Sequence, residues 1–444
     1  MSIETRLKFE KVCKWTAIIF MVLTMVNVFM PDLFVVSIEQ EELTLDNRPQ
    51  AFVRWFNAVA FLVIPIIAFF NKPTFKKIAV YFCLPMAIIY LCFFKEIMEF
   101  MTSPYGRGIY EIRFMPQAAK DFMINPIFRG GLLIATSLCN ITTIILMIIR
   151  DPKFLKFKKD EILPFFIILI CLIISIIPCY VPQYILGTYT DIILTAFSLP
   201  HFCWLIFMVL EIVFLTLIFK DKKYEDKYIL LLCLSLTLLI QYNQMFSSLG
   251  ELTCKRMPFQ LCNIGSYLML ITLLTKNERL YQFNLIINVA GGLIAAVMMD
   301  VEGKGLFYLW NMHYLVEHNN VIVTPILCML LNMFRPLRGV DYKYFVRNFT
   351  FYWLFILVLG TILNGVKDIT GNDYFQVNYL FMFMREATEK IVSFVGPWFD
   401  IQIHIGPFTL YPIVQLAVLL GFIAIGSIVF IAFIGLFRKR KILI

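Results

Sequence analysis

Apolar runs of about twenty residues alternate with short charged segments along most of the chain. A helix of this length crosses a bilayer, and lipid requires each spanning segment to satisfy its own backbone hydrogen bonds. The pattern therefore predicts an all-α fold, a polytopic transmembrane helical bundle of about twelve spans. The predicted spans are residues 15–31, 52–70, 78–94, 130–149, 162–180, 192–219, 228–249, 257–275, 281–299, 312–334, 349–366 and 411–437.

The composition favours the same class of protein. Of the 444 residues, 60% are hydrophobic and only 16% are charged, proportions well outside those of soluble domains. The first predicted span follows a basic segment that includes Lys8 and Lys14, and it lacks a small-residue cleavage site. We therefore interpret it as an uncleaved anchor rather than a removed signal peptide.

Basic residues favour one side of the predicted membrane. If the N-terminus is cytoplasmic, the loops on its side carry 26 of the 39 Lys and Arg residues but only 10 of the 30 Asp and Glu residues. The positive-inside rule then predicts that both termini are cytoplasmic. The formal net charge of +9 reflects this orientation, so we expect no nucleic-acid partner.

Polar residues divide the chain into two parts. Residues 1–190 contain five predicted spans without any catalytic spacing, and we interpret them as an N-terminal membrane module of unknown role. Residues 191–444 carry polar side chains inside their spans, so we expect the site there. Glu211 is one of them, and a charge in lipid is costly enough that it should face the interior. We expect its polar partner on the seventh or tenth span.

One cysteine of the second part has a distinctive setting. Residues 257–265 (MPFQLCNIG) begin with a proline, place polar Gln260 and Asn263 beside Cys262, and lead into a long apolar run. This pattern predicts a helix that enters the membrane, with the thiol about one turn below the interface. All four histidines fall on this same predicted outer side: His201, His313, His318 and His404.

Four short motifs occur in a familiar order: SLPH at 198–201, MPFQLCN at 257–263, EH at 317–318 and GPW at 396–398. In order and rough spacing they resemble the YwaF family of bacterial integral membrane proteins, over about residues 192–437. That family is similar in turn to the eukaryotic transmembrane-protein-164 acyltransferases. The resemblance implies a phospholipid acyltransferase in a bacterial plasma membrane. This chain has Gln260 and Asn263 where bacterial relatives commonly carry His and Asp.

By matching position, the resemblance implies Cys262 as a nucleophile and His318 as its partner, with His201 nearby. A neighbouring imidazole can take the proton of a thiol, and the thiolate can then accept an acyl group from a lipid ester. We expect membrane phospholipids as donor and acceptor, and no cofactor; the oligomeric state is not predicted. The predicted substrate-binding residues are Gln260, Asn263, Glu317, Asn319 and Glu211.

Other interpretations of these residues stay open. The polar side chains can simply hold helices together by hydrogen bonds, and a buried Glu211 also fits a transporter or a non-catalytic scaffold. A zinc site is a further alternative, with ligands from His201, His313, Glu317, His318 and Cys262. However, His313 and His318 are five residues apart, about 140° around a helix, and do not share one face. We therefore predict no metal.

Overall fold

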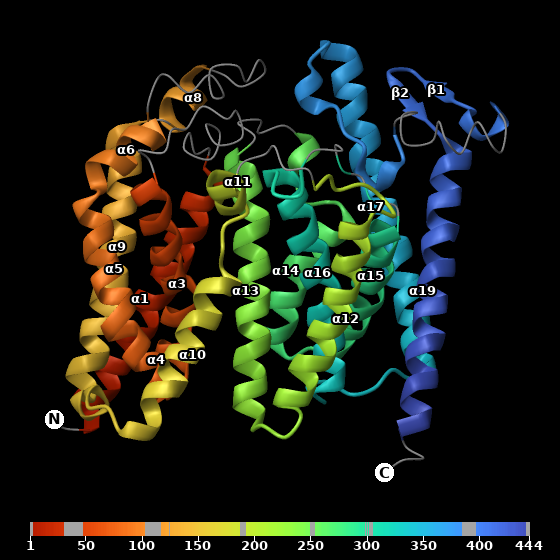
Figure 1. Cartoon of the computed structure of the whole chain (residues 1–444). Helices are drawn as coiled ribbons and strands as arrows, with labels where there is room; N and C mark the ends of the chain where they lie inside the picture. The colour runs from red at the N-terminus through yellow and green to blue at the C-terminus, as the bar shows by residue number, and fades with distance from the viewer. Residues whose placement is uncertain are drawn as a thin grey trace. The chain divides into compact units, whose positions relative to one another are not determined.

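The computed structural model in Figure 1 describes residues 3–30, 48–102, 117–123, 125–186, 192–248, 254–297, 299, 301, 305–383 and 397–440. The contacts divide the chain into two compact units. The first contains residues 1–193, 239–251 and 304–313, and the second contains residues 194–238, 252–303 and 314–444. Helices α13 and α16, defined below, contribute residues to both units. Whether residues 1–190 form a separate module stays a prediction.

The first unit is a group of helices around α3, whose apolar residues between Val59 and Ile67 are buried. Helix α1 packs along α9, where the hydroxyl of Thr143 donates to the hydroxyl of Thr16 at 2.8 Å. The helices are α1 Ile3–Phe29, α3 Arg48–Phe69, α4 Pro73–Ile78, η2 Ala79–Cys83, α5 Leu84–Cys92, α6 Phe94–Thr102, α8 Gln117–Met123, α9 Pro126–Arg150, η3 Pro152–Leu155, α10 Lys159–Ser175 and α11 Tyr180–Leu186.

In the second unit the helices surround α15, which is buried along most of its length and packs against α14, α17 and α19. The helices are α12 Leu199–Phe219, α13 Tyr224–Ser248, η4 Cys254–Arg256, α14 Leu261–Thr275, α15 Glu278–Val297, α16 Leu309–Leu330, α17 Gly339–Thr370, η5 Asp373–Phe375, η6 Tyr379–Phe381, η7 Pro397–Asp400 and α19 Pro412–Arg440. Two short antiparallel strands, β1 Ile403–Ile405 and β2 Phe408–Leu410, pair His404 with Thr409.

Two glycines allow the close packing of α15. A Cβ atom on Gly265 of α14 would lie 1.8 Å from Oδ1 of Asn288, and one on Gly292 would lie 2.4 Å from Cγ1 of Ile322. Any larger residue would therefore push α15 away from α14 or α16, which is the usual reason for small residues between membrane helices.

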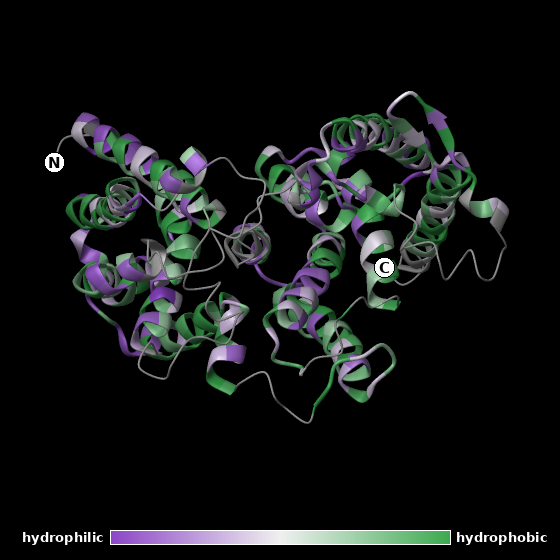
Figure 2. Cartoon of the chain, turned by 90° about the horizontal axis from the view of Figure 1, so that it is seen from above, coloured by the Kyte–Doolittle hydropathy of each residue, from purple (hydrophilic) through white to green (hydrophobic). Residues whose placement is uncertain are grey.

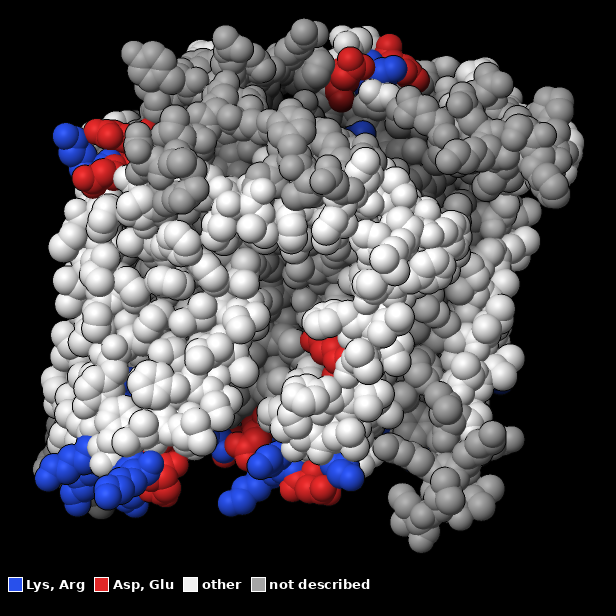
Figure 3. Space-filling model, viewed as in Figure 1, with Lys and Arg blue, Asp and Glu red and all other residues white. Residues whose placement is uncertain are grey.

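Eight helices of the described residues are long and apolar enough to cross a membrane, or nine if the bent pair α10 and α11 is one span. Hydrophobic residues recur along the helices of both units (Figure 2). On the face shown in Figure 3, most charged side chains gather near the two ends of the helices, and the band between them is largely uncharged apart from one acidic patch. The chain is therefore an all-α, multi-pass membrane protein.

The number of spans and the orientation of the termini stay predictions. The predicted spans 228–249, 257–275 and 312–334 are helical, as α13, α14 and α16, but they are not among the eight. Helix α14 is short, with 15 residues, and α16 carries His, Glu and Asn side chains.

Candidate functional site

Cys262 is the second residue of α14. The backbone N–H groups of Cys262 and Asn263 lie within hydrogen-bond reach of the sulfur. The thiol donates to Oδ1 of Asn263 at 3.2 Å. The first N–H groups of a helix have no partner within the helix, and they stabilise negative charge placed there. These N–H groups favour a thiolate, whereas burial of the sulfur and the nearby carboxyl group of Glu317 oppose it.

Glu317 of α16 is the acidic neighbour of this thiol. Its side chain is 4% exposed and lies within hydrogen-bond reach of the Cys262 sulfur. Helix α16 begins at Leu309, so Glu317 lies in its third turn, about 12 Å along the axis, whereas Cys262 lies in the first turn of α14. The sequence predicts that Cys262 and His318 both lie near the first turn of their helices. For His318 this is wrong, because it follows Glu317 in the third turn of α16.

His318 has a defined tautomer in this structure. Its Nδ1 lies 2.8 Å from the carbonyl oxygen of Tyr314, which can only accept a hydrogen bond, so Nδ1 carries the proton. In the neutral ring, Nε2 then holds the lone pair that a general base needs. The ring also stacks on Tyr314, with centroids 4.2 Å apart. His318 is next to Glu317 in the chain, but the two side chains start about 100° apart around α16.

His201 links two backbone segments of the second unit. Its Nδ1 accepts from the N–H of Phe197 at 2.9 Å, so Nε2 carries the proton and donates to the carbonyl oxygen of Ala296 at 2.7 Å. Ala296 lies in the last turn of α15, where carbonyls lack partners within the helix. The hydroxyl of Tyr314 donates to the carbonyl of Ala295 in the same turn. Both ring nitrogens of His201 therefore form hydrogen bonds with backbone groups in this conformation.

Gln260, one of the predicted substrate-binding residues, forms hydrogen bonds with a neighbouring loop. Its Oε1 accepts from the N–H of Leu380 at 3.0 Å, and its Nε2 donates to the carbonyl of Asn378 at 3.3 Å. The hydroxyl of Tyr352 donates to the carbonyl of Phe259 at 2.6 Å. These three hydrogen bonds fix the chain immediately before Cys262, which keeps the start of α14 in place.

The segment before α14 has a second attachment at Cys254. The hydroxyl of Tyr379 donates to the carbonyl of Cys254. Burial raises the pKa of the Tyr379 hydroxyl and of the Cys254 thiol, so both groups stay neutral at neutral pH. Cys254 is therefore a poor nucleophile in this environment.

Glu211 has the kind of partner that the sequence predicts. Nδ2 of Asn319 on α16 donates to its Oε2 at 2.7 Å. The prediction that Glu211 meets a polar group from the seventh or tenth span is confirmed, because α16 is the tenth predicted span. A neutral amide does not balance the charge of a carboxylate, and unbalanced charges are rare in lipid.

The remaining histidines lie elsewhere. His313 belongs to the first unit, where its ring contacts Trp310 edge-on. His404 is exposed, and its Nδ1 lies 3.1 Å from the hydroxyl of Thr409. Within the described residues, no group of three or more His, Cys, Asp or Glu side chains is arranged to hold a metal ion.

Sequence reasoning did not single out Tyr314 or Tyr352. Tyr314 orients the His318 ring and also contacts the end of α15, while Tyr352 fixes the residue before Gln260. Both are aromatic residues in apolar helices, where packing is the ordinary role. Position Tyr314, four residues before His318, was the one available signal, because such residues share a helix face.

A profile of the TMEM164 family matches residues 196–427 of this chain. No curated protein and no solved structure matches it significantly. The matched segment is just over half of the 444 residues and includes Cys262, Glu317 and His318, while the first five predicted spans precede it. Membership of the bacterial YwaF family stays a prediction. The chain belongs to the TMEM164 family.

Proposed function

We propose that this protein is a membrane acyltransferase that moves a fatty acyl group between lipids through a thioester on Cys262. The observation that carries the proposal is the setting of that sulfur. It lies at the start of α14, beside two backbone N–H groups and the carboxyl group of Glu317. A thiol has to lose its proton before it can attack an ester. The two N–H groups stabilise the resulting negative charge, whereas burial and the Glu317 carboxyl group oppose it, so the proposal requires a base that takes the proton.

The reaction divides into two balanced steps. In the first, the Cys262 sulfur attacks the ester carbonyl of a donor phospholipid, and the ester C–O bond breaks. The released lysophospholipid oxygen takes the proton that the thiol gave to a base. In the second step, a hydroxyl or amine of the acceptor lipid loses a proton to that base and attacks the thioester. The C–S bond then breaks and the thiolate returns, so no oxidant, reductant or cofactor is needed.

Two groups of α16 are suited to handle the proton. Nε2 of His318 holds a lone pair because Nδ1 donates to the Tyr314 carbonyl. Glu317 lies within hydrogen-bond reach of the sulfur. We propose that His318 is the base and that Glu317 passes the proton between the thiol and the imidazole. The free N–H groups at the start of α14 are candidates for binding the oxyanion of each tetrahedral intermediate.

A phospholipid substrate fits the shape of this part of the protein. Helix α14 has 15 residues and is about 22 Å long, shorter than the hydrocarbon core of a bilayer at about 30 Å. A short helix can start below the membrane surface. We propose that Cys262 therefore lies near the depth of phospholipid ester groups in the outer leaflet, with the phospholipids as donor and acceptor.

The test uses purified protein in vesicles that contain a phospholipid with an isotope-labelled acyl chain and an unlabelled lysophospholipid acceptor. We expect Cys262→Ser to lower transfer by at least about 10²-fold, because a serine hydroxyl is far harder to ionise than a thiol. Protein-bound label that hydroxylamine releases should also disappear. The matched control is Cys203→Ser on α12, because Cys203 is an exposed thiol of the same unit.

The outcome distinguishes an acyltransferase from a transporter or a non-catalytic scaffold. Full acyl transfer by Cys262→Ser would refute the proposal. A transporter or a scaffold would give no labelled lipid product and no hydroxylamine-sensitive label in the unmodified protein. In that case the hydrogen bonds around Cys262 would only hold α14 against α16.

A further inference from the structure

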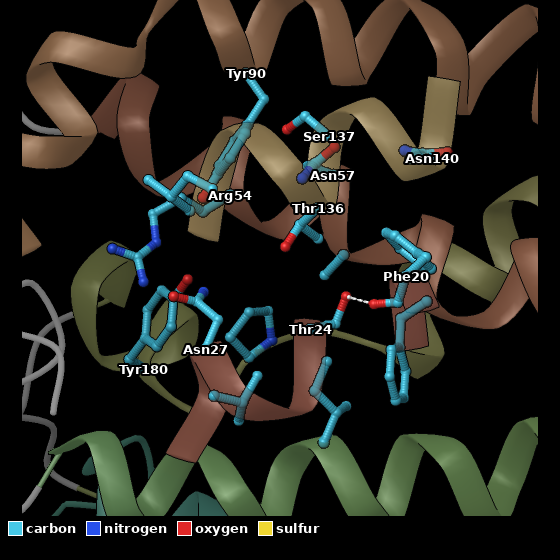
Figure 4. A pocket seen from close by; sticks show the side chains of 16 residues that line it. Phe20, Thr24, Asn27, Arg54, Asn57, Tyr90, Thr136, Ser137, Asn140 and Tyr180 are labelled. Atoms are coloured by element: carbon cyan, nitrogen blue, oxygen red, sulfur yellow. Dashed lines mark hydrogen bonds between the residues drawn. The ribbon is translucent and has the colours of Figure 1, made fainter. Parts of the chain in front are cut away.

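The first unit contains a polar cavity that the acyl-transfer proposal does not use. The cavity has a volume of ≈ 110 Å³ and is lined by residues of α1, α3, α5, α9, α11 and α13 that all belong to this unit. Figure 4 shows its walls, with Thr24 and Asn27 from α1, Arg54 and Asn57 from α3, and Asn140 from α9. Polar walls within apolar helices are costly in lipid, so they call for a ligand or water.

Three amide oxygens on these walls lack a hydrogen-bond donor among the described residues. They are the Oδ1 atoms of Asn27, Asn57 and Asn140, and all three are buried. Asn140 is only 1% exposed. A buried polar atom without a partner costs free energy, so each of these oxygens favours a bound hydroxyl or amine.

An arginine side chain in the lining favours a ligand that carries a negative charge. Among the described residues that line the cavity, Arg54 is the one Lys, Arg, Asp or Glu, so this part of the lining presents a guanidinium group and no carboxyl group. In Figure 4, Arg54, Asn27 and Tyr180 lie on one side, and Ser137, Asn57 and Asn140 lie on the other. A planar guanidinium binds phosphate oxygens particularly well.

We propose that this cavity binds a phosphate ester that also carries hydroxyl or amine donors. The phosphate would lie at Arg54, and the donors would reach the asparagine oxygens. The head group of phosphatidylglycerol has this chemistry, and so does its water-soluble fragment glycerol 3-phosphate. The choline head group lacks such donors, and diacylglycerol lacks the phosphate. A cavity of this volume could instead hold roughly three or four waters, which is the alternative that the test must exclude.

The location of the cavity fits a lipid head group. Its residues lie towards one end of the unit: Asn27 is near the end of α1, whereas Arg54 is near the start of α3 and Tyr180 begins α11. Phe20 and Leu133 add apolar surface beside the polar groups. A site with both surfaces suits the junction between a head group and its acyl chains.

The experiment is native mass spectrometry of the delipidated full-length protein. It is incubated separately with phosphatidylglycerol, phosphatidylcholine and diacylglycerol of the same acyl chains, and with glycerol 3-phosphate. We expect one bound phosphatidylglycerol, at least about tenfold more occupied than either of the other two lipids. Arg54→Gln should lower its affinity by about 10- to 100-fold, as for loss of a charge-assisted hydrogen bond.

Two further variants make the result specific. Arg54→Lys keeps the positive charge and should retain binding within a few-fold, which also shows that this position tolerates substitution. The matched control is Lys95→Gln, which removes the same charge from a side chain that is 84% exposed and outside the cavity lining. It should bind like the unmodified protein.

The binding results either support or overturn the proposed phosphate-ester site. Binding of glycerol 3-phosphate alone, with the same dependence on Arg54, would support a phosphate-ester site with a soluble ligand. Equal retention of phosphatidylglycerol and diacylglycerol, or unchanged binding by Arg54→Gln, would overturn the proposal. Failure of all four probes to bind would also overturn it and leave a cavity that holds only water.

Discussion

Replacing His201 with alanine should reduce stability far more than it reduces acyl transfer per folded molecule. The ring accepts from the N–H of Phe197 and donates to the carbonyl of Ala296, and the side chain is only 1% exposed. His201→Ala leaves one buried donor and one buried acceptor without partners. At about 1–3 kcal/mol for each, the expected loss is about 2–6 kcal/mol of the free energy of unfolding.

His318→Ala should show the opposite pattern. Its side-chain hydrogen bond goes to the carbonyl of Tyr314, four residues earlier in the same helix, which α16 can satisfy with a backbone N–H. Losing this one bond should cost about 0.5–1.5 kcal/mol. If His318 is the general base, however, acyl transfer should fall by about 10²- to 10⁴-fold.

The measurement needs two readouts from each purified variant in the same detergent. Thermal unfolding, followed by circular dichroism, reports stability. The initial rate of acyl transfer, divided by the fraction of folded protein, reports catalysis. A His201→Ala protein with normal stability but no acyl transfer would refute the claim that His201 mainly stabilises the fold through its hydrogen bonds to the backbone. It would instead place His201 in the reaction. Normal acyl transfer by His318→Ala would refute the proposal that His318 is the general base.

Three other predictions concern α16 and its neighbours. Glu317→Gln cannot relay a proton, so acyl transfer should fall at least about tenfold without a change in fold; an unchanged rate would rule out the relay. Asn319→Leu leaves the carboxyl group of Glu211 without its amide, so stability should fall by about 1–3 kcal/mol, and adding Glu211→Leu should restore part of it, as measured by thermal unfolding. Gly292→Ala places a Cβ 2.4 Å from Ile322 and should cost about 1–3 kcal/mol, whereas full stability would mean that the helices can separate freely.

The helical architecture could be predicted from the sequence because lipid leaves few alternatives. A long apolar run must satisfy its own backbone, so each of the twelve predicted spans overlaps at least one helix of the described residues. The helix ends were harder to predict. Helix α16 was expected from residue 312 but begins at Leu309, because Trp310 and Asn311 are compatible with a helix although they interrupt the apolar pattern.

The chemistry of the site was only partly visible in the sequence. Cys262 and His318 stand out by residue type, but the hydrogen bonds that define His201 reach Ala296, 95 residues away. Such partners depend on the packing of α12 against the end of α15, which no local pattern encodes. The polar cavity of the first unit had a sequence signal that carried no assigned role: asparagines within apolar runs, as at Asn57 and Asn140.

The contacts of α16 bear on the roles proposed for Glu317 and His318. Successive residues of a helix point about 100° apart. Glu317 meets Cys262 on α14, and Asn319, about 200° further round, meets Glu211 on α12. Helix α16 therefore lies between α12 and α14, and these two contacts fix its rotation. By the same helical geometry His318 starts in a direction between these two contacts, so the proposed proton path from the thiol to the imidazole would pass Glu317.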